Sequence, residues 1–197
     1  MHLGARGGSG ACGNPGTWYI RAMAKLETPR DRCFPAIESA TAHTLVLGSL
    51  PGRRSLDMRQ YYAHPQNAFW KIVAAVFDAG WPLPYERAVE VLTSHGVAVW
   101  DVLAEARRPG SLDSAIIPAT ARVNDFAAFF RAHPRMRRVF FNGRKAEELY
   151  RRAVLPGLSG EFDGLSHACL PSTSPAHAGV SFARKLAMWQ TIGEKPG

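Results

Sequence analysis

Two polar segments lie far apart in the chain, and each directly follows an apolar run. Residues 48–52 read Gly-Ser-Leu-Pro-Gly after the apolar residues 44–47, and residues 170–178 begin Leu-Pro-Ser-Thr-Ser-Pro at the end of another apolar run. Ligands of open α/β sheets bind at the carboxyl ends of the strands. We therefore expect both loops at one sheet edge, where backbone N–H groups and hydroxyls can hold a phosphate chain around a pocket.

An aromatic segment at residues 61–70, Tyr-Tyr-Ala-His-Pro-Gln-Asn-Ala-Phe-Trp, follows the first loop. Aromatic faces can stack on a nucleobase, which contributes about 1–3 kcal/mol per base. Phe69 and Trp70 begin a predicted helix, so core packing is favoured for them. Tyr61 and Tyr62 precede that helix and are the better stacking candidates.

Single polar residues near predicted strand ends are further candidates for chemistry. Asn142 ends a strand, and its carboxamide could read a base edge or simply form a turn. Asn67 could be functional or cap a helix. Asp101 follows the strand at residues 97–100 and is either a general base or a turn cap. The hydroxyls of residues 172–174, followed by Pro175, suit phosphate contacts and a helix start equally well.

Alternating apolar patterns predict an α/β fold. Strands are expected at residues 44–47, 97–100, 138–141 and 167–170, and helices at residues 67–79, 85–94, 124–132, 144–152 and 180–192. Asn124 is expected to cap the third helix. Strands that alternate with helices pair in parallel through right-handed crossovers. The prediction is a three-layer α/β/α sandwich around a central, mostly parallel four-stranded sheet.

Length and composition limit the classes of protein. The 197 residues, 46% of them hydrophobic, suit one domain at residues 31–197, after a Gly-rich extension at residues 1–30 that we expect to be disordered. The formal charge of +8 favours a polyanionic partner. The three cysteines cannot all pair, which argues against a disulfide framework, and no two of them have C-x-x-C spacing. No apolar run is long enough to cross a membrane, so we expect a cytoplasmic protein.

In combination, these segments resemble the uracil-DNA glycosylase superfamily. Residues 48–52 match its first motif, and residues 172–177 match its second, the loop that grips DNA and inserts into the duplex. Together with residues 61–70, 110–114 and 140–143, the chain looks most like the sixth family, the hypoxanthine-DNA (deoxyinosine) glycosylases. The resemblance covers residues 34–192.

The resemblance implies a monofunctional DNA glycosylase that flips a deaminated base out of the stack and lets water replace it. Hypoxanthine is the first expectation for the base, and uracil or mismatched uracil or thymine is the alternative. The implied partner is double- or single-stranded DNA with deaminated bases. No cofactor or metal is implied, and we expect a monomer that works at the bacterial nucleoid.

The resemblance also implies roles for individual residues. Leu50 stands where many relatives carry a polar residue that positions water, so Asn67 becomes the catalytic candidate and a non-catalytic DNA-binding module is a further alternative. Ala176 stands where relatives carry a wedging Leu, and His177 could replace it. The base-binding candidates are Asn142, Tyr62, Ser49 and Leu50. The DNA-binding candidates are Gly48, Pro51, Gly52, Ser172, Thr173, Ser174, Pro175, Ala176 and His177.

Overall fold

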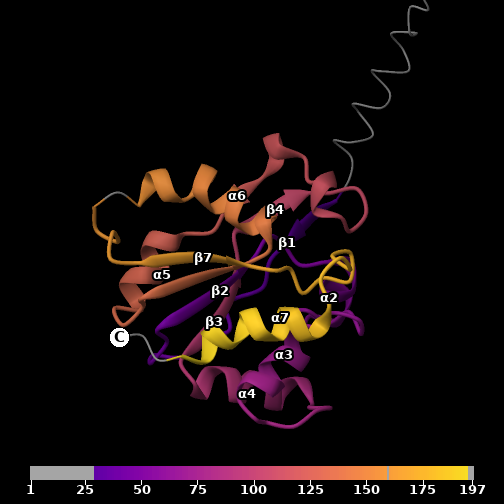
Figure 1. Cartoon of the computed structure of the whole chain (residues 1–197). Helices are drawn as coiled ribbons and strands as arrows, with labels where there is room; N and C mark the ends of the chain where they lie inside the picture. Colours follow the sequence, from indigo (N-terminus) through magenta and orange to yellow (C-terminus); the bar gives the residue numbers. More distant parts are fainter. Residues whose placement is uncertain (1–28, 159, 195–197) are drawn as a thin grey trace, which may run out of the picture.

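Four parallel strands form the centre of the molecule. The computed structural model describes residues 29–158 and 160–194, and Figure 1 shows the chain as a ribbon. The strand order is β3-β2-β6-β7, and every neighbouring pair is parallel. The strands are β2 (Thr44–Gly48), β3 (Val97–Asp101), β6 (Arg138–Asn142) and β7 (Ser166–Leu170). The predicted four-stranded parallel sheet is therefore confirmed.

The strands end side by side, which brings four distant parts of the sequence together. Strand β2 is buried at all five positions, as expected for a central parallel strand covered on both faces. Its last residue, Gly48, pairs with Asp101 at the end of β3. Likewise, Asn142 at the end of β6 pairs with Leu170 at the end of β7. This register sets the edge where the candidate loops begin.

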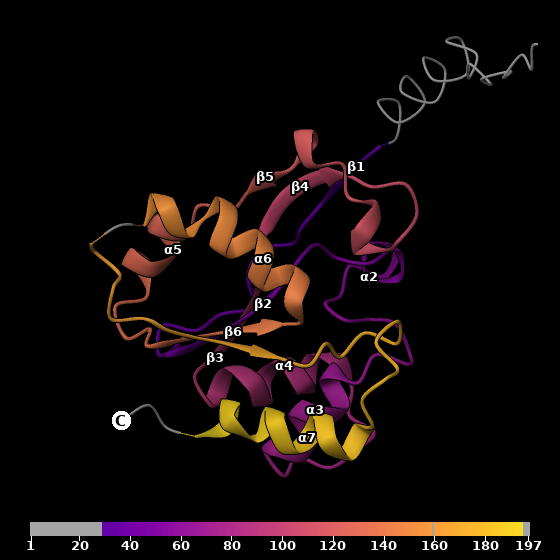
Figure 2. The same ribbon diagram turned by 45° about the horizontal axis from the view of Figure 1, so that its top comes forward.

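Helices cover both faces of the sheet, which completes the predicted three layers. In both views α3, α4 and α7 lie on one face and α5 and α6 on the other (Figures 1 and 2). Short α2 follows the first motif at the open edge. The α-helices are α2 (Arg53–Met58), α3 (Phe69–Val76), α4 (Tyr85–Ser94), α5 (Phe126–Ala132), α6 (Arg144–Ala153) and α7 (Phe182–Trp189). The 3₁₀ turns are η1 (Asp113–Ala115), η2 (Pro118–Thr120), η3 (Leu155–Gly157) and η4 (Gln190–Gly193).

A second, antiparallel sheet of order β1-β4-β5 was not predicted from the sequence. Its strands are β1 (Arg30–Arg32), β4 (Leu103–Arg107) and β5 (Arg122–Val123). They are short and rich in charge, so they lack the apolar runs that marked the parallel strands. Arg30 pairs with Arg107 in this sheet, so the ordered domain begins before residue 31. The rest of the extension that we expected to be disordered, residues 1–28, lies outside the described residues.

The predicted boundaries of two helices were wrong at both ends. Helix α3 begins at Phe69 rather than at Asn67 and ends at Val76. The predicted helix at residues 180–192 is divided into α7, capped by Ser181, and the 3₁₀ turn η4.

We predicted that Asn124 caps α5, but the cap is Asp125. The Asp125 side chain accepts a hydrogen bond from the N–H of Ala128. The Asn124 carboxamide donates to the Asp101 carbonyl oxygen at 2.8 Å instead, so a tertiary contact decides between two good capping residues.

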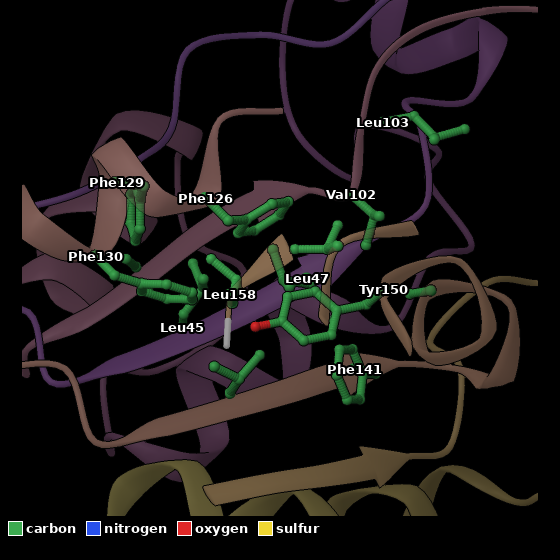
Figure 3. Close-up of a cluster of buried hydrophobic side chains, with 14 of the residues drawn as sticks. Leu45, Leu47, Val102, Leu103, Phe126, Phe129, Phe130, Phe141, Tyr150 and Leu158 are labelled. Carbon is green, nitrogen blue, oxygen red and sulfur yellow. The ribbon is translucent and has the colours of Figure 1, made fainter. Parts of the chain in front are cut away.

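The core is built on both faces of the sheet. Between the sheet and α5 and α6, Phe126, Phe141 and Tyr150 pack against the leucines of β2 (Figure 3). On the other face Phe69 and Trp70 are buried, which confirms that they serve core packing. Tyr61 is also in this core. Its ring packs edge-on against Phe34 at 5.3 Å and is too buried to offer a face for stacking.

Two buried tyrosines allow a matched test of polar burial. The Tyr150 hydroxyl is buried without a hydrogen-bond partner in the described part of the chain, whereas the Tyr61 hydroxyl donates to the Phe34 carbonyl at 3.1 Å. We expect Tyr150→Phe to be neutral or to raise the free energy of unfolding by up to about 1 kcal/mol, because it removes an unpaired polar group. Tyr61→Phe should lower it by about 1 kcal/mol. Urea unfolding of both variants measures the difference, and an equal loss in both would contradict this account.

Candidate active site

A pocket of about 1190 Å³ opens at the carboxyl edge of the parallel sheet. Its walls come from the two loops singled out in the sequence, from the start of α6, and from Tyr61, Tyr62, His64 and Asn67. In both views the loop after β7 passes close to α2, as expected if the two motifs share one site (Figures 1 and 2). Every candidate residue named from the sequence lines this pocket.

Thr173 connects three of these walls. Its N–H donates to Asn142 Oδ1 at 2.8 Å, and its Oγ1 accepts from Asn142 Nδ2 at 2.8 Å. Its carbonyl oxygen accepts from the N–H of Ala68, next to Asn67, at 3.0 Å. Thr173 is 1% exposed, so these bonds are shielded from water. The second motif is thereby tied both to the end of β6 and to the segment before α3.

The bond to the Thr173 backbone fixes how Asn142 presents its carboxamide. A backbone N–H only donates, so the atom that faces it must be the Asn142 oxygen rather than the nitrogen. The second N–H of Asn142 Nδ2, on a side chain that also interacts with the Tyr62 hydroxyl, and a second lone pair of Oδ1 are not used in these two bonds. The adjacent Gly143 has φ +97°, and a Cβ there would lie 2.8 Å from the Ser172 Cβ, so only glycine allows this close approach.

Gly48, Asp101 and Tyr62 form the floor of the pocket. A Cβ at Gly48 would lie 2.3 Å from Asp101 Oδ1 and 3.1 Å from the Tyr62 hydroxyl. Glycine at this position therefore gives both oxygens room to approach the same point. Tyr62 has φ 55°, a strained conformation for a non-glycine residue, and its ring lies 4.1 Å from the Phe69 ring, centroid to centroid. Phe69 thus supports the Tyr62 ring from the core side.

Asp101 is a buried acid in a setting that favours its neutral form. Burial raises the pKa of its carboxyl to about 8, the negative charge of Asp113 adds to this shift, and Arg108 opposes it. The side chain is therefore mainly protonated at pH 7. A protonated acid donates hydrogen bonds and does not accept a proton, so the interpretation of Asp101 as a general base is not supported.

A cluster of charged side chains on the side away from the solvent fixes the first motif, residues 48–52. Arg108, fully buried, donates from Nη2 to Asp31 Oδ2 at 2.9 Å and to the carbonyl oxygen of Pro51. Its Nη1 lies 3.6 Å from Asp113 Oδ1. The Ser49 hydroxyl donates to Asp113 Oδ2 at 2.6 Å. Ser49 and Pro51 are thereby fixed to side chains from other parts of the chain.

The remaining residues of the first motif act through their backbone and their packing. Leu50 is 5% exposed and belongs to the core cluster on the α5 and α6 face. The carbonyls of Gly48 and Ser49 accept hydrogen bonds from the residues that follow β3. Gly52 is the N-cap of α2 without a side-chain bond. The motif is a rigid turn, and Leu50 anchors it in the core.

Asn67 lies in the turn before α3. Its Oδ1 accepts from the N–H of Phe69 at 3.0 Å, and its own N–H donates to the His64 carbonyl at 2.8 Å. The carboxamide is therefore held in place on the pocket wall. The N-cap of α3 is Ala68, so Asn67 is not the helix cap, although its side chain bonds to the first residue of the helix.

The tip of the second motif is exposed, and its base is supported. Pro175, Ala176 and His177 are exposed at the pocket rim. Buried Lys185 donates from Nζ to the His177 carbonyl at 2.8 Å. A further bond joins Trp189 Nε1 to the Pro171 carbonyl at 2.9 Å. Helix α7 thus holds the loop at two points while its tip faces solvent.

Positive charge surrounds the pocket mouth, and several contributors were missed in the sequence. Exposed Arg53, Arg54, Arg144 and Arg184 line it and suit a polyanionic ligand. Arg108 and Lys185 were also missed. The Arg107-Arg108-Pro109-Gly110 run before the segment at residues 110–114 was the available signal for Arg108. Within the described residues, no three His, Cys, Asp or Glu side chains gather in a way that could hold a metal ion. None of the helices in the described part of the chain could cross a membrane.

Removal of the buried Arg108 side chain should destabilise the fold. We expect Arg108→Met to lower the free energy of unfolding by about 3–5 kcal/mol, because buried Asp31 loses its buried partner and keeps only the 3.4 Å contact with exposed Arg53. The matched control is Arg87→Met, which removes an exposed pair with Glu90 and should leave unfolding unchanged. Denaturant unfolding measures both variants. Equal stability of the two would show that the buried cluster contributes nothing.

Comparisons with known proteins agree with this architecture. The family model of the Uracil DNA glycosylase superfamily matches residues 34–193. A protein named hypoxanthine DNA glycosylase from Methanosarcina acetivorans is 36% identical over 162 residues, which cover 82% of this chain and 96% of that protein. Its namesake from Methanosarcina barkeri is 32% identical over 116 residues, 58% of this chain and 72% of that protein.

A solved structure shares the fold as well. The solution NMR structure of a candidate uracil DNA glycosylase from Methanosarcina acetivorans superposes with a TM-score of 0.68 at 32% identity. The match covers 84% of this chain and all of that one. The family model covers most of the chain and the relatives are 32–36% identical to it, so the chain belongs to the uracil DNA glycosylase superfamily.

Proposed function

We propose that the protein is a monofunctional DNA glycosylase that removes hypoxanthine from deoxyinosine in DNA. The observation that carries the proposal is the Asn142 carboxamide, oriented by Thr173 in the pocket of a chain of this superfamily. The names of the relatives from Methanosarcina support hypoxanthine as the base.

The free positions of Asn142 match the lactam edge of hypoxanthine. Oδ1 can accept from N1–H of the base while Nδ2 donates to O6. Adenine presents an acceptor at N1 and a donor at N6, the reverse arrangement, so the fixed carboxamide would face like groups. Asn142 would thereby reject the undamaged parent base. Uracil carries the same lactam, so this contact alone does not distinguish uracil from hypoxanthine, and only excision assays on both bases can do so.

A flipped base would fit between the floor and the walls of the pocket. Extrusion costs a few kcal/mol and is needed because the glycosidic bond is shielded inside the duplex. Tyr62, whose ring packs against Phe69, lines the pocket and would stack on the base. The Ser49 hydroxyl is bonded to Asp113 and the Leu50 side chain is packed in the core, so both would support the pocket rather than bond to the base.

Asn67 would position the attacking water. The C1′–N9 bond breaks, its electron pair leaves with the base, and the water oxygen bonds to C1′ and loses its proton to solvent. An asparagine is a poor base, but a fixed carboxamide can orient water and favour a sugar that gains positive charge. Leu50 has no polar atom for this task and is buried in the core.

The DNA backbone would follow the pocket rim. Gly48, Pro51 and Gly52 keep the first motif narrow, so that a phosphate can approach its backbone. The residues expected to hold the flanking phosphates are Ser172, Thr173, Ser174 and Pro175. The arginines of the rim would add attraction that weakens with salt. Exposed Ala176 and His177 would occupy the space left in the duplex, with His177 as the larger of the two.

The proposal includes a location and a state. A DNA repair enzyme of this kind would work as a monomer in the cytoplasm, at the nucleoid, on double- or single-stranded DNA. The complete pocket on one chain supports the monomer.

A cleavage panel tests the substrate. We expect labelled duplexes with deoxyinosine to break after incubation with the protein and hot alkali, because excision leaves an alkali-labile abasic site. Parallel duplexes carry xanthine, uracil or thymine opposite each base. Clear preference for uracil would replace hypoxanthine as the substrate. Binding of inosine DNA without cleavage would favour the non-catalytic module.

Asn67→Ala tests the catalytic assignment. We expect the single-turnover rate on inosine DNA to fall about 100-fold, because water is no longer oriented. Binding of the same DNA should change little, as the rim is intact. The neighbouring exposed Gln66 does not line the pocket, so Gln66→Ala is the matched control. A rate within about twofold of the wild type would contradict the role of Asn67.

A further inference from the structure

Two buried oxygens on the pocket floor lack a partner. Asp101 Oδ2 and the Tyr62 hydroxyl are both buried, and neither has a hydrogen-bond partner in the described residues. Asp101 is 3% exposed, yet it lines the pocket. An unsatisfied buried polar group destabilises the folded state, so two such groups in one place need an explanation. Because Asp101 lines the pocket, a ligand bound there could pair with its carboxyl group.

The position of Asp101 is fixed by the backbone rather than by side-chain bonds. It is the last residue of β3, in register with Gly48, and its carbonyl oxygen accepts from Asn124 Nδ2. The absence of a Cβ at Gly48 leaves the space that Oδ1 occupies. The carboxyl group therefore reaches the pocket floor beside the first motif, while Asn142 stands at the end of β6 across β2.

The charged and titratable groups around Asp101 come from several elements. Asp113 adds negative charge, and buried Arg108 adds positive charge but is engaged with Asp31 and Asp113. The others that interact with Asp101 are Cys33, Tyr61 and Tyr62, whose pKa values are raised first by burial and also by the charge of Asp101. These surroundings disfavour a carboxylate on the floor and favour the protonated acid.

We propose that Asp101, as a neutral carboxylic acid, donates a hydrogen bond to the flipped base and stabilises the base as it leaves. This rests on the proposed glycosylase function. When the C1′–N9 bond breaks, its electron pair places negative charge on the base, and the Asp101 O–H points its dipole at that charge. The water that bonds to C1′ releases a proton to solvent, and the free base takes up one proton. No oxidant or cofactor enters the balance.

A hydrogen-bond donor aimed at developing charge is worth about 100-fold or more in rate when it is preorganised. Ionisation of Asp101 would do the opposite, because a carboxylate beside an anionic base repels it. The rate should therefore depend on the protonation of Asp101. It is level while the acid is protonated and falls about tenfold for each pH unit above its pKa of about 8.

The test is the single-turnover excision rate on inosine duplex from pH 6 to pH 10. Wild type should show the decline above about pH 8. Asp101→Asn keeps the shape and an N–H donor but does not ionise, so its rate should stay more nearly level over the range in which wild type declines. Asp101→Leu lacks a donor and should be slower by about 100-fold at every pH. Exposed Asp57 lies outside the pocket, so Asp57→Asn should follow wild type.

Thermal unfolding of the same variants shows that they fold, and it reports on Asp101 independently of activity. The folded state holds the Asp101 proton between the ordinary value of 3.8 and about 8, so stability from this group is lost as pH rises through that window. The melting temperature of Asp101→Asn should therefore exceed that of wild type by a margin that grows from pH 5 to pH 8.

The outcomes separate the two proposals. If wild type does not excise hypoxanthine from any duplex, the proposed function fails. If wild type excises hypoxanthine but Asp101→Asn shows the same pH profile, the role of Asp101 is overturned. Folded Asp101→Leu with a rate within about twofold of wild type would overturn it as well.

Discussion

The hydrogen bonds of Thr173 are the constraint on which the site depends. Its N–H and Oγ1 hold Asn142 in one orientation, and its carbonyl holds Ala68 beside Asn67. Three segments that are distant in sequence therefore share one buried residue. Since the bonds are shielded from water, loss of any one leaves a buried polar group unpaired. The two carboxamides that we propose for base recognition and water positioning are thus held by the same residue.

The floor of the pocket contains groups that do not stabilise the fold. Arg108 and Asp31 form a buried pair that fixes the first motif, and this arrangement leaves Asp101 without a cation of its own. The consequence is a carboxyl group that stays protonated near neutral pH. Such a group weakens the fold as pH rises, but it offers a donor that an ordinary aspartate lacks. Strain at Tyr62 in the same place fits a region shaped by ligand binding.

The two motifs differ in burial and support, although their amino-acid compositions are similar. The first is a rigid turn with its side chains turned to the core and to the ionic cluster. The second has a tied base at Thr173 and an exposed tip at His177, supported by Lys185. In the proposed function, the first motif would form a fixed wall of the pocket and the exposed tip of the second would reach the DNA.

The sequence by itself determined the parallel sheet and the place of the site. Apolar runs before Gly48 and Leu170 predicted strands, and parallel strands bring their carboxyl ends to one edge. The short β1, β4 and β5 strands gave no such signal, and two adjacent capping residues left the start of α5 open, until the bond between Asn124 and Asp101 decided it. Only the tertiary structure showed that Asp101 is buried, that Arg108 is its neighbour and that Thr173 orients Asn142. These properties depend on burial and on contacts with residues far away in the chain, and a local sequence pattern predicts neither.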